Sequence, residues 1–305
     1  MHAKKTAAKI AKSVKITKAA SNDFVIEDGK NLSNLQNVIS GINFWKDSVI
    51  VSSGYLALNA YSEGYGKMYV NAGGTAISTG LGGGEDDTDH YGTVYCYSEM
   101  FVSSGGKAID TNVYRGNLVV SSGGTVSNTV VKVGDWYNDE VFGLRVEKGG
   151  IAIDTKLEGE ENEPAVFSLE GNASSTTINN HGFFIVSSGG TATNTIVRNE
   201  VEDDFEDEDF FELFYDVHGF LVEKGGTAFN TTIKEKGAFS LQGKASSTTV
   251  SSGGIFAICS GGTAIDTKVL AGGKLIVEEG GKEINTTCED KQKNAKNKKL
   301  KSIEP

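Results

Sequence analysis

Proline and cysteine are scarce in this sequence, whose 305 residues include 2 prolines and 3 cysteines. A glycine-rich disordered linker usually contains more proline and fewer aliphatic residues, so the 39 glycines indicate tight turns between short strands. Cys96, Cys259 and Cys288 show neither metal-ligand spacing nor the pattern of a disulfide framework.

Long apolar runs are absent as well. No stretch approaches the roughly 20 apolar residues of a membrane-spanning helix, so the chain is not expected to span a membrane. The N-terminus is basic, but no apolar segment of a signal peptide follows it. The net charge is −11, yet both ends are lysine-rich. We therefore expect flexible basic segments at 1–23 and 289–305 around a repeat domain at 24–288, and no nucleic-acid partner.

One phrase, Val-Ser-Ser-Gly-Gly-Thr-Ala, recurs with small variations along the chain. Each copy can be anchored on the first residue of its Gly-Gly pair or on the equivalent position. The anchors are Gly54, Gly73, Gly105, Gly123, Gly149, Glu170, Gly189, Gly225, Gln242, Gly261 and Gly280. Such self-similarity at a short period is typical of solenoids.

Apolar residues and threonines occupy fixed positions relative to the anchors. Three residues before the anchor stand Val51, Val70, Val102, Val120, Val146, Phe167, Val186, Val222, Phe239, Ile258 and Val277. Six residues after it stand Thr79, Thr111, Thr129, Thr155, Thr176, Thr195, Thr231, Thr248, Thr267 and Thr286. Because side chains alternate between the two faces of a strand, each set of positions lies on one face. The pattern therefore predicts one buried column of apolar residues and one buried column of threonines.

These columns predict an all-β fold, a single parallel β-helix of about eleven coils, because one unit is too short to bury its apolar face alone. We expect the threonine hydroxyls to bond to neighbouring coils. Asn and Asp recur five residues after the anchor, as in Asp110, Asn128 and Asn194, and are expected to form a hydrogen-bonded ladder.

Four insertions, at 82–97, 132–143, 158–164 and 198–217, interrupt the repeat after its second strand, which places them along one edge. They are acidic, and aromatic residues lie among the acids. The expected contact residues of this binding edge are Trp136, Tyr137, Phe205, Phe210 and Phe211. Asp203, Asp204, Asp207 and Asp209 are weak candidates for Ca²⁺ ligands, since their spacing matches no known calcium loop. The alternative is a solvated loop.

The repeat at residues 186–197, with variants at 120–131, 222–233 and 258–269, resembles the passenger repeat of AIDA-type autotransporter adhesins. The resemblance implies a right-handed parallel β-helix at a Gram-negative cell surface or outside the cell, serving adhesion, self-association and biofilm growth. Some members carry heptose on serine and threonine. The matching outward hydroxyls here are Ser103, Ser121, Ser187 and Ser188. Neither the family's signal peptide nor its C-terminal membrane barrel is visible.

Three functions fit the sequence. The first is a non-enzymatic module, without a required cofactor, that binds host or bacterial surface molecules or other copies of itself through repeated contacts. The second is a polysaccharide-cleaving β-helix enzyme, although Asp110, Asp154 and Asp266 recur as a ladder and no nucleophile–base pair can be argued from spacing. The third is an intracellular or otherwise exported scaffold.

Overall fold

The chain forms two compact units, residues Met1–Ile153 and Asp154–Pro305. The computed structural model describes residues 15–18, 23–27, 37–62, 64–86, 94–133, 136–137, 140–141, 143–160, 163–199 and 219–289. Every regular element in these ranges is a β-strand, and the strands make about eleven stacked turns. The prediction of an all-β solenoid is therefore confirmed.

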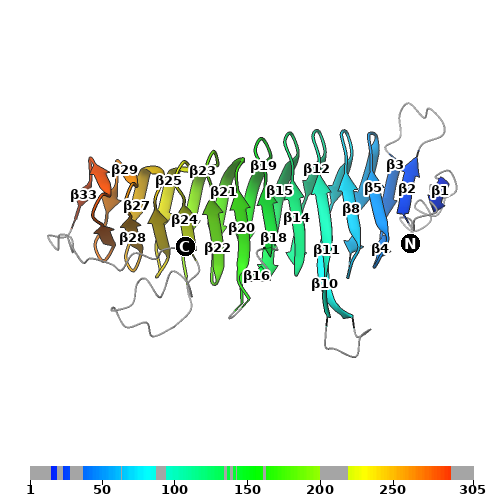
Figure 1. Cartoon of the computed structure of the whole chain (residues 1–305), viewed down its shortest axis with the longest axis horizontal. Coiled ribbons are helices and arrows are strands. Elements are labelled where there is room, and N and C mark those ends of the chain that lie inside the picture. Colours follow the sequence, from blue (N-terminus) through cyan, green and yellow to red (C-terminus); the bar gives the residue numbers. More distant parts are fainter. Residues whose placement is uncertain are drawn as a thin grey trace, which may run out of the picture. The chain divides into compact units, whose positions relative to one another are not determined.

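In the first unit, each coil has a leading strand and one or two following strands, which a glycine turn separates wherever the turn is described (Figure 1). The leading strands are β2 (Asp23–Glu27), β5 (Ser48–Val51), β8 (Lys67–Val70), β11 (Val94–Val102), β14 (Gly116–Val120) and β18 (Gly143–Val146). The following strands are β3 (Asn37–Ser40), β4 (Asn43–Phe44), β6 (Tyr55–Leu58), β7 (Tyr61–Ser62), β9 (Thr75–Ile77), β10 (Gly80–Asp86), β12 (Lys107–Ile109), β13 (Asn112–Tyr114) and β15 (Thr125–Val133). Three strands lie outside this scheme: β1 (Lys15–Lys18), β16 (Trp136–Tyr137) and β17 (Glu140–Val141).

The second unit repeats the same arrangement. Its leading strands are β20 (Ala165–Leu169), β22 (Gly182–Val186), β24 (Gly219–Val222), β26 (Ala238–Leu241), β28 (Ile255–Ile258) and β31 (Lys274–Val277). Its following strands are β21 (Asn172–Ile178), β23 (Thr191–Val197), β25 (Thr227–Ile233), β27 (Lys244–Val250), β29 (Thr263–Ile265), β30 (Lys268–Val269), β32 (Lys282–Ile284) and β33 (Thr287–Cys288). Strand β19 (Ile151–Leu157) contains the unit boundary.

Parallel pairing in register joins each coil to the next. Met100 of β11 pairs with Met68 of β8 and Leu118 of β14. In the second unit Val222 of β24 pairs in the same way with Val186 of β22. Because equivalent residues meet, the apolar face of each coil continues into its neighbour and forms a core inside each stack.

The inward columns form this core, as the sequence predicts. Val186 and Phe220 are completely buried and Val269 is 6% exposed. A column of small residues, mostly alanine, lies three residues after the anchor and is also buried. Its members include Ala57, Ala76, Ala108, Ala152, Ala192, Ala228 and Ala264.

Five phenylalanines stack inside the second unit, and the sequence alignment assigned two of them to the wrong column. Phe167 pairs with Phe184, and Phe239 pairs with Phe220, so both belong two positions earlier than the column to which the anchors assigned them. Leu169 and Leu241 occupy the valine column instead. The cause is a turn shortened by two residues: Glu170-Gly171 and Gln242-Gly243 replace the usual four-residue turn.

The glycine turn uses its two glycines differently. The first has a positive φ, as at Gly189 with 89°, which residues with a side chain rarely adopt. The second lies against the preceding coil, since a Cβ on Gly190 would be 2.4 Å from the carbonyl oxygen of Leu169. Stacked turns also bond directly: the Gly189 N–H donates to the Gly225 carbonyl at 3.1 Å.

The Asn and Asp column turns the backbone in the middle of the following strand. Its members adopt positive φ, for example 54° at Asp110 and 57° at Asn194, a conformation that Asn and Asp tolerate well. Amides bond to the neighbouring copy, with Asn128 donating to Asp110 and Asn230 donating to Asn194 at 2.6 Å. The predicted ladder is confirmed for these pairs.

The threonine column is buried, but its hydroxyls do not bond to neighbouring coils as predicted. Thr195, Thr231 and Thr248 are each 1% exposed. Their Oγ1 atoms have no hydrogen-bond partner in the structure, and neither do those of most other copies. The reason is that the ladder between coils already uses the strand N–H and carbonyl groups.

Replacing Thr231 by valine should therefore leave stability unchanged or raise it by up to about 1 kcal/mol. Valine has the same shape and removes an unpaired buried hydroxyl, whose desolvation costs about 1–3 kcal/mol. Chemical denaturation of the full chain measures this difference. The matched control, Thr231→Ser, keeps the hydroxyl and loses the methyl group, so it should destabilise. If Thr231→Val also destabilised the protein, the Thr231 hydroxyl would make a stabilising hydrogen bond in the folded chain, as the sequence predicts.

Candidate binding surface

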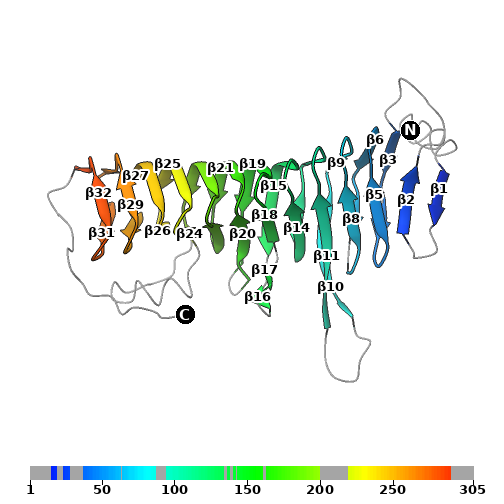
Figure 2. The same cartoon turned by 45° about the horizontal axis from the view of Figure 1, so that its top comes forward.

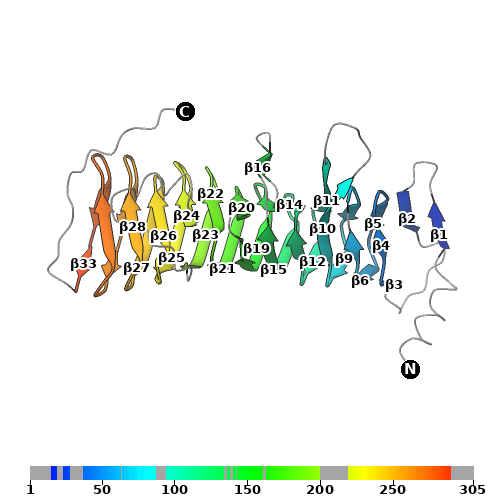
Figure 3. The same ribbon diagram turned by 90° about the horizontal axis from the view of Figure 1, so that it is seen from below.

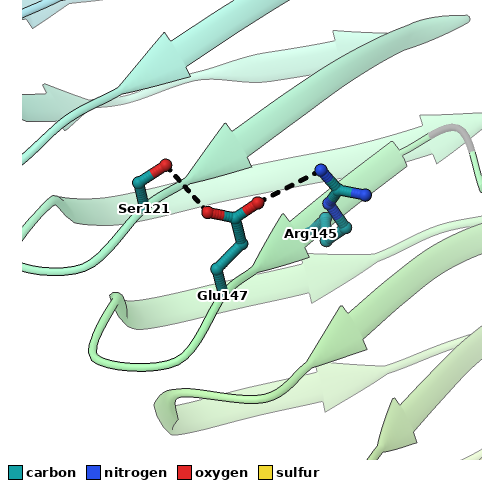
Figure 4. Close-up of polar contacts among 3 residues, drawn as sticks. All are labelled: Ser121, Arg145 and Glu147. Carbon is teal, nitrogen blue, oxygen red and sulfur yellow. Dashed lines mark hydrogen bonds and ion pairs between the residues drawn. The ribbon is translucent and has the colours of Figure 1, made fainter.

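The outer surface of the coils contains the serines singled out as glycan acceptors. Ser103, Ser121 and Ser187 directly follow leading strands and are half-buried. Ser121 donates a hydrogen bond of 2.9 Å to Glu147 on the next coil, and Glu147 pairs with Arg145 at 3.2 Å (Figure 4). Hydroxyls at this position therefore face outward beside the turn, where polar neighbours contact them.

Ser188 lies one residue further into the turn and has a different environment. Its side chain is exposed, and a Cβ placed on Gly225 of the next coil would be 2.5 Å from its Oγ. Ser104 and Ser122 have the same relation to Gly123 and Gly149. Hydroxyls at this position thus point along the stack toward the next glycine.

Two of the four insertions belong to the first unit and project from the same edge of it (Figures 2 and 3). The first continues strands β10 and β11 as an antiparallel pair, in which Gly83 lies opposite Tyr97. The second contains the hairpin of β16 and β17, where Trp136 pairs with Val141. Within this unit the two insertions lie along one edge, as the sequence predicts.

The other two insertions belong to the second unit. The shorter one is closed by an antiparallel bridge between Glu160 and Glu163. Most of the longer one lies outside the described residues, and so do its proposed contact and calcium residues. These are Asp203, Asp204, Phe205, Asp207, Asp209, Phe210 and Phe211. Within the described ranges, no group of three or more His, Cys, Asp or Glu side chains could hold a metal ion.

Charged and titratable groups on the coils pair locally. Lys67 of β8 forms an ion pair with Glu99 of β11, and this hydrogen bond raises the pKa of Lys67. Burial raises the pKa of Cys259 to about 11, although its Sγ lies 3.1 Å from the Ser240 hydroxyl. Cys259 is therefore a protonated thiol at neutral pH, which is unreactive as a nucleophile.

Sequence reasoning missed a group of exposed aromatic residues in the first unit. Trp45 is 39% exposed, Tyr61 43%, Tyr65 40% and Tyr114 43%. The available signal was glycine at 80 and 82 in the neighbouring strand β10, where the repeat otherwise has larger residues. Glycine inside a strand marks a close approach by another group.

Comparison with known proteins identifies relatives of this architecture. Residues 235–290 match the family model described as adhesin of bacterial autotransporter system, probable stalk (AIDA). The solved structure of a TibC-catalysed, hyper-glycosylated TibA fragment has 25% sequence identity and a TM-score of 0.50, and the alignment covers 86% of this chain and 97% of that chain.

A second solved structure, the receptor-binding domain of the Siphovirus 9NA tailspike, has 9% identity and a TM-score of 0.20. The alignment covers 93% of this chain and 77% of that chain. This likeness is too low to bear on the fold. No curated protein sequence matches the chain significantly. Among the described residues, no helix has the length and apolarity to cross a membrane.

The fold and the outer surface define a parallel β-solenoid of the stalk type, with turns and insertions as its variable parts. The resemblance to AIDA-type autotransporter passenger repeats is confirmed by the match at 235–290 and by the TibA fragment. These findings support an adhesin-like passenger module.

Proposed function

We propose that this chain is a non-enzymatic surface module that mediates adhesion or self-association through the outside of its coils. The observation that carries the proposal is the adhesin-stalk match at 235–290, joined to the TibA-like fold over 86% of the chain. Its partners are surface molecules of a host or a bacterium, or further copies of the chain, and it acts at the cell surface or outside the cell. No cofactor is required.

The regular part of each coil offers repeated and similar contacts, whereas the insertions offer distinctive ones. We assign specific binding to the insertion edge, with Trp136 and Tyr137 in one unit and Phe205, Phe210 and Phe211 in the other. Aromatic side chains supply contact area that a purely solvating loop does not need. The surrounding acids favour a basic partner and make the contact sensitive to salt.

The serine positions are proposed sites of sugar attachment. Support comes from the TibA fragment, which is hyper-glycosylated by TibC. Ser103, Ser121 and Ser187 lie on the outer surface beside the glycine turn, and Ser188 is exposed within it. A sugar on any of these hydroxyls would lie outside the core and leave the stack intact.

Deletion of residues 200–216 tests the binding edge. The deletion should shift the melting temperature by less than about 2 °C, because the loop adds no residue to the repeat columns. It should reduce self-association in sedimentation experiments, or binding to cultured cells, by at least about tenfold.

Two variants of equal length separate the contributions of the loop. Replacing Phe205, Phe210 and Phe211 by serine keeps its charge, and replacing its acids by Asn and Gln keeps its aromatic residues. The first change should abolish association, and the second should remove its salt dependence. If the deletion left stability and every association intact, the longest insertion would have no binding role.

A further inference from the structure

An aromatic surface of the first unit lies where the following strands end, beside the start of its two insertions, since Tyr61 covers Gly82 and Tyr114 pairs with Val133. We define the aromatic platform as Trp45, Tyr61, Tyr65 and Tyr114, each 39–43% exposed. These side chains contribute little to the core, because inward positions on the same strands are filled by Phe44 and Val113, which are buried. Large aromatic groups kept at the surface of a stable stack need another explanation.

Strand register brings the platform together across consecutive coils. Tyr61 of β7 pairs with Asn43 of β4 on one side and with Gly80 of β10 on the other. Gly80 in turn pairs with Asn112 of β13. Tyr114 lies two residues after Asn112 on the same face of β13, opposite Gly82.

Glycines allow the rings to lie flat against the backbone. A Cβ on Gly80 would be 2.6 Å from Cδ2 of Tyr61, and a Cβ on Gly82 would be 2.5 Å from its Oη. The Tyr61 ring therefore covers β10 from Gly80 to Gly82. The Trp45 indole lies over Gly64 in the same way, with 2.9 Å from its Cε2 to an added Cβ. One face of each ring is thus supported by backbone, and the other faces outward.

Cations at the edge of the platform fix two further rings. The Lys46 ammonium lies 5.4 Å from the centre of the Tyr65 ring, and the Arg115 guanidinium lies 6.0 Å from the Tyr114 ring. These cation–π contacts hold the rings in place. A ligand therefore meets rings that are already ordered, which lowers the entropy lost on binding.

We propose that the aromatic platform binds a neutral polysaccharide. The outward faces of the Trp45 and Tyr61 rings suit the C–H faces of sugar rings, which stack on aromatic faces. Asn43 and Asn112 are exposed on either side of Tyr61, where their amides can both donate to and accept from sugar hydroxyls. The proposal names a partner class for the proposed adhesive function and rests on that function.

Charge selects a neutral polymer over an anionic one. Nucleic-acid bases also stack on aromatic rings, but their phosphates and the carboxylates of acidic polysaccharides are repelled by a chain of net charge −11. The nearby cations Lys46 and Arg115 lie over rings of the platform itself. Stacking and amide contacts therefore provide the recognition.

Native gel electrophoresis of the full chain through dextran, mannan, galactomannan or xyloglucan tests the proposal, with alginate as the anionic comparison. At least one neutral polymer should retard the chain, and alginate should not. Trp45→Ala and Tyr61→Ala should each weaken the affinity derived from the retardation at least about tenfold, since each removes a ring on which a sugar would stack. The matched control is Phe229→Ala, which removes a ring of equal exposure, 43%, from the second unit.

Two further measurements test whether unfolding of the alanine variants, rather than loss of a ring, explains weaker retardation. Gly82→Ala should weaken retardation although it keeps every ring, because the added methyl displaces the Tyr61 ring. In a Trp136→Phe background Trp45 is the remaining tryptophan, and its fluorescence should change on titration with the retarding polymer.

Three outcomes would overturn the inference: no retardation by any neutral polymer, equal losses in Phe229→Ala, or loss of self-association rather than of retardation in Trp45→Ala. The last outcome would make the platform a contact between copies of the chain. If neutral polymers do not retard the chain but cells that display it still adhere, the proposed function stands while this inference fails.

Discussion

Replacing Phe220 by alanine is expected to lower the free energy of unfolding by about 3–5 kcal/mol, as is typical of large cavities in a packed core. Phe220 is completely buried and stacks between Phe184, with ring centres 5.1 Å apart, and Phe239, at 4.6 Å. Its loss interrupts the phenylalanine stack in the middle, so adjacent coils lose contacts too. Guanidinium denaturation of the full chain measures the change.

Phe229→Ala is the control for this prediction. Phe229 lies on β25 of the same unit but is 43% exposed, so its truncation should cost less than about 1 kcal/mol. Similar losses for the two variants would show that the assignment of inward and outward positions is wrong.

Replacing Gly190 by alanine is expected to cost about 3 kcal/mol, near the upper end of the range for overpacking. The added Cβ would lie 2.4 Å from the Leu169 carbonyl oxygen and 3.0 Å from Cγ1 of Val186. The contact with Leu169, which lies on the preceding coil, cannot relax without separating the two coils. The melting temperature and the denaturation midpoint should both fall.

The adjacent glycine provides a matched comparison of the same chemical change. Gly189 has a φ of 89°, but the nearest atom to an added Cβ, the carbonyl oxygen of Glu170, is 3.9 Å away. Gly189→Ala should therefore cost about 1–2 kcal/mol, from the left-handed conformation alone. A larger loss at Gly189 than at Gly190 would contradict the close coil-to-coil approach described here.

The repeat columns were predictable because they follow from the period of two and from stacking. Val186, Val222 and Thr231 are buried where the sequence places them. Phe167 and Phe239 were misplaced, since the anchors assumed a constant turn length. Turn length is not encoded in hydrophobic alternation. The phenylalanine stack was the signal that would have revealed the shorter turns.

The unpaired threonine hydroxyls were not predictable from the columns. Sequence periodicity gives the face of a residue, but it does not give the partners that remain once the strand ladder is complete. The aromatic platform was missed for a related reason. Tyr61 and Gly80 share a column of neighbouring repeats, but the alignment does not show the direction of the Tyr61 ring, which extends along β10 as far as Gly82.

The settling rate of bacteria that display the full chain on their surface tests the central claim, that this solenoid is a binding module. Displaying cells should settle or adhere faster than cells that display Phe220→Asp, whose buried charge disrupts the coils. Polysaccharides in the medium should keep their length throughout. Equal settling of the two kinds of cells, or shortening of a polysaccharide by the intact chain alone, would contradict the claim.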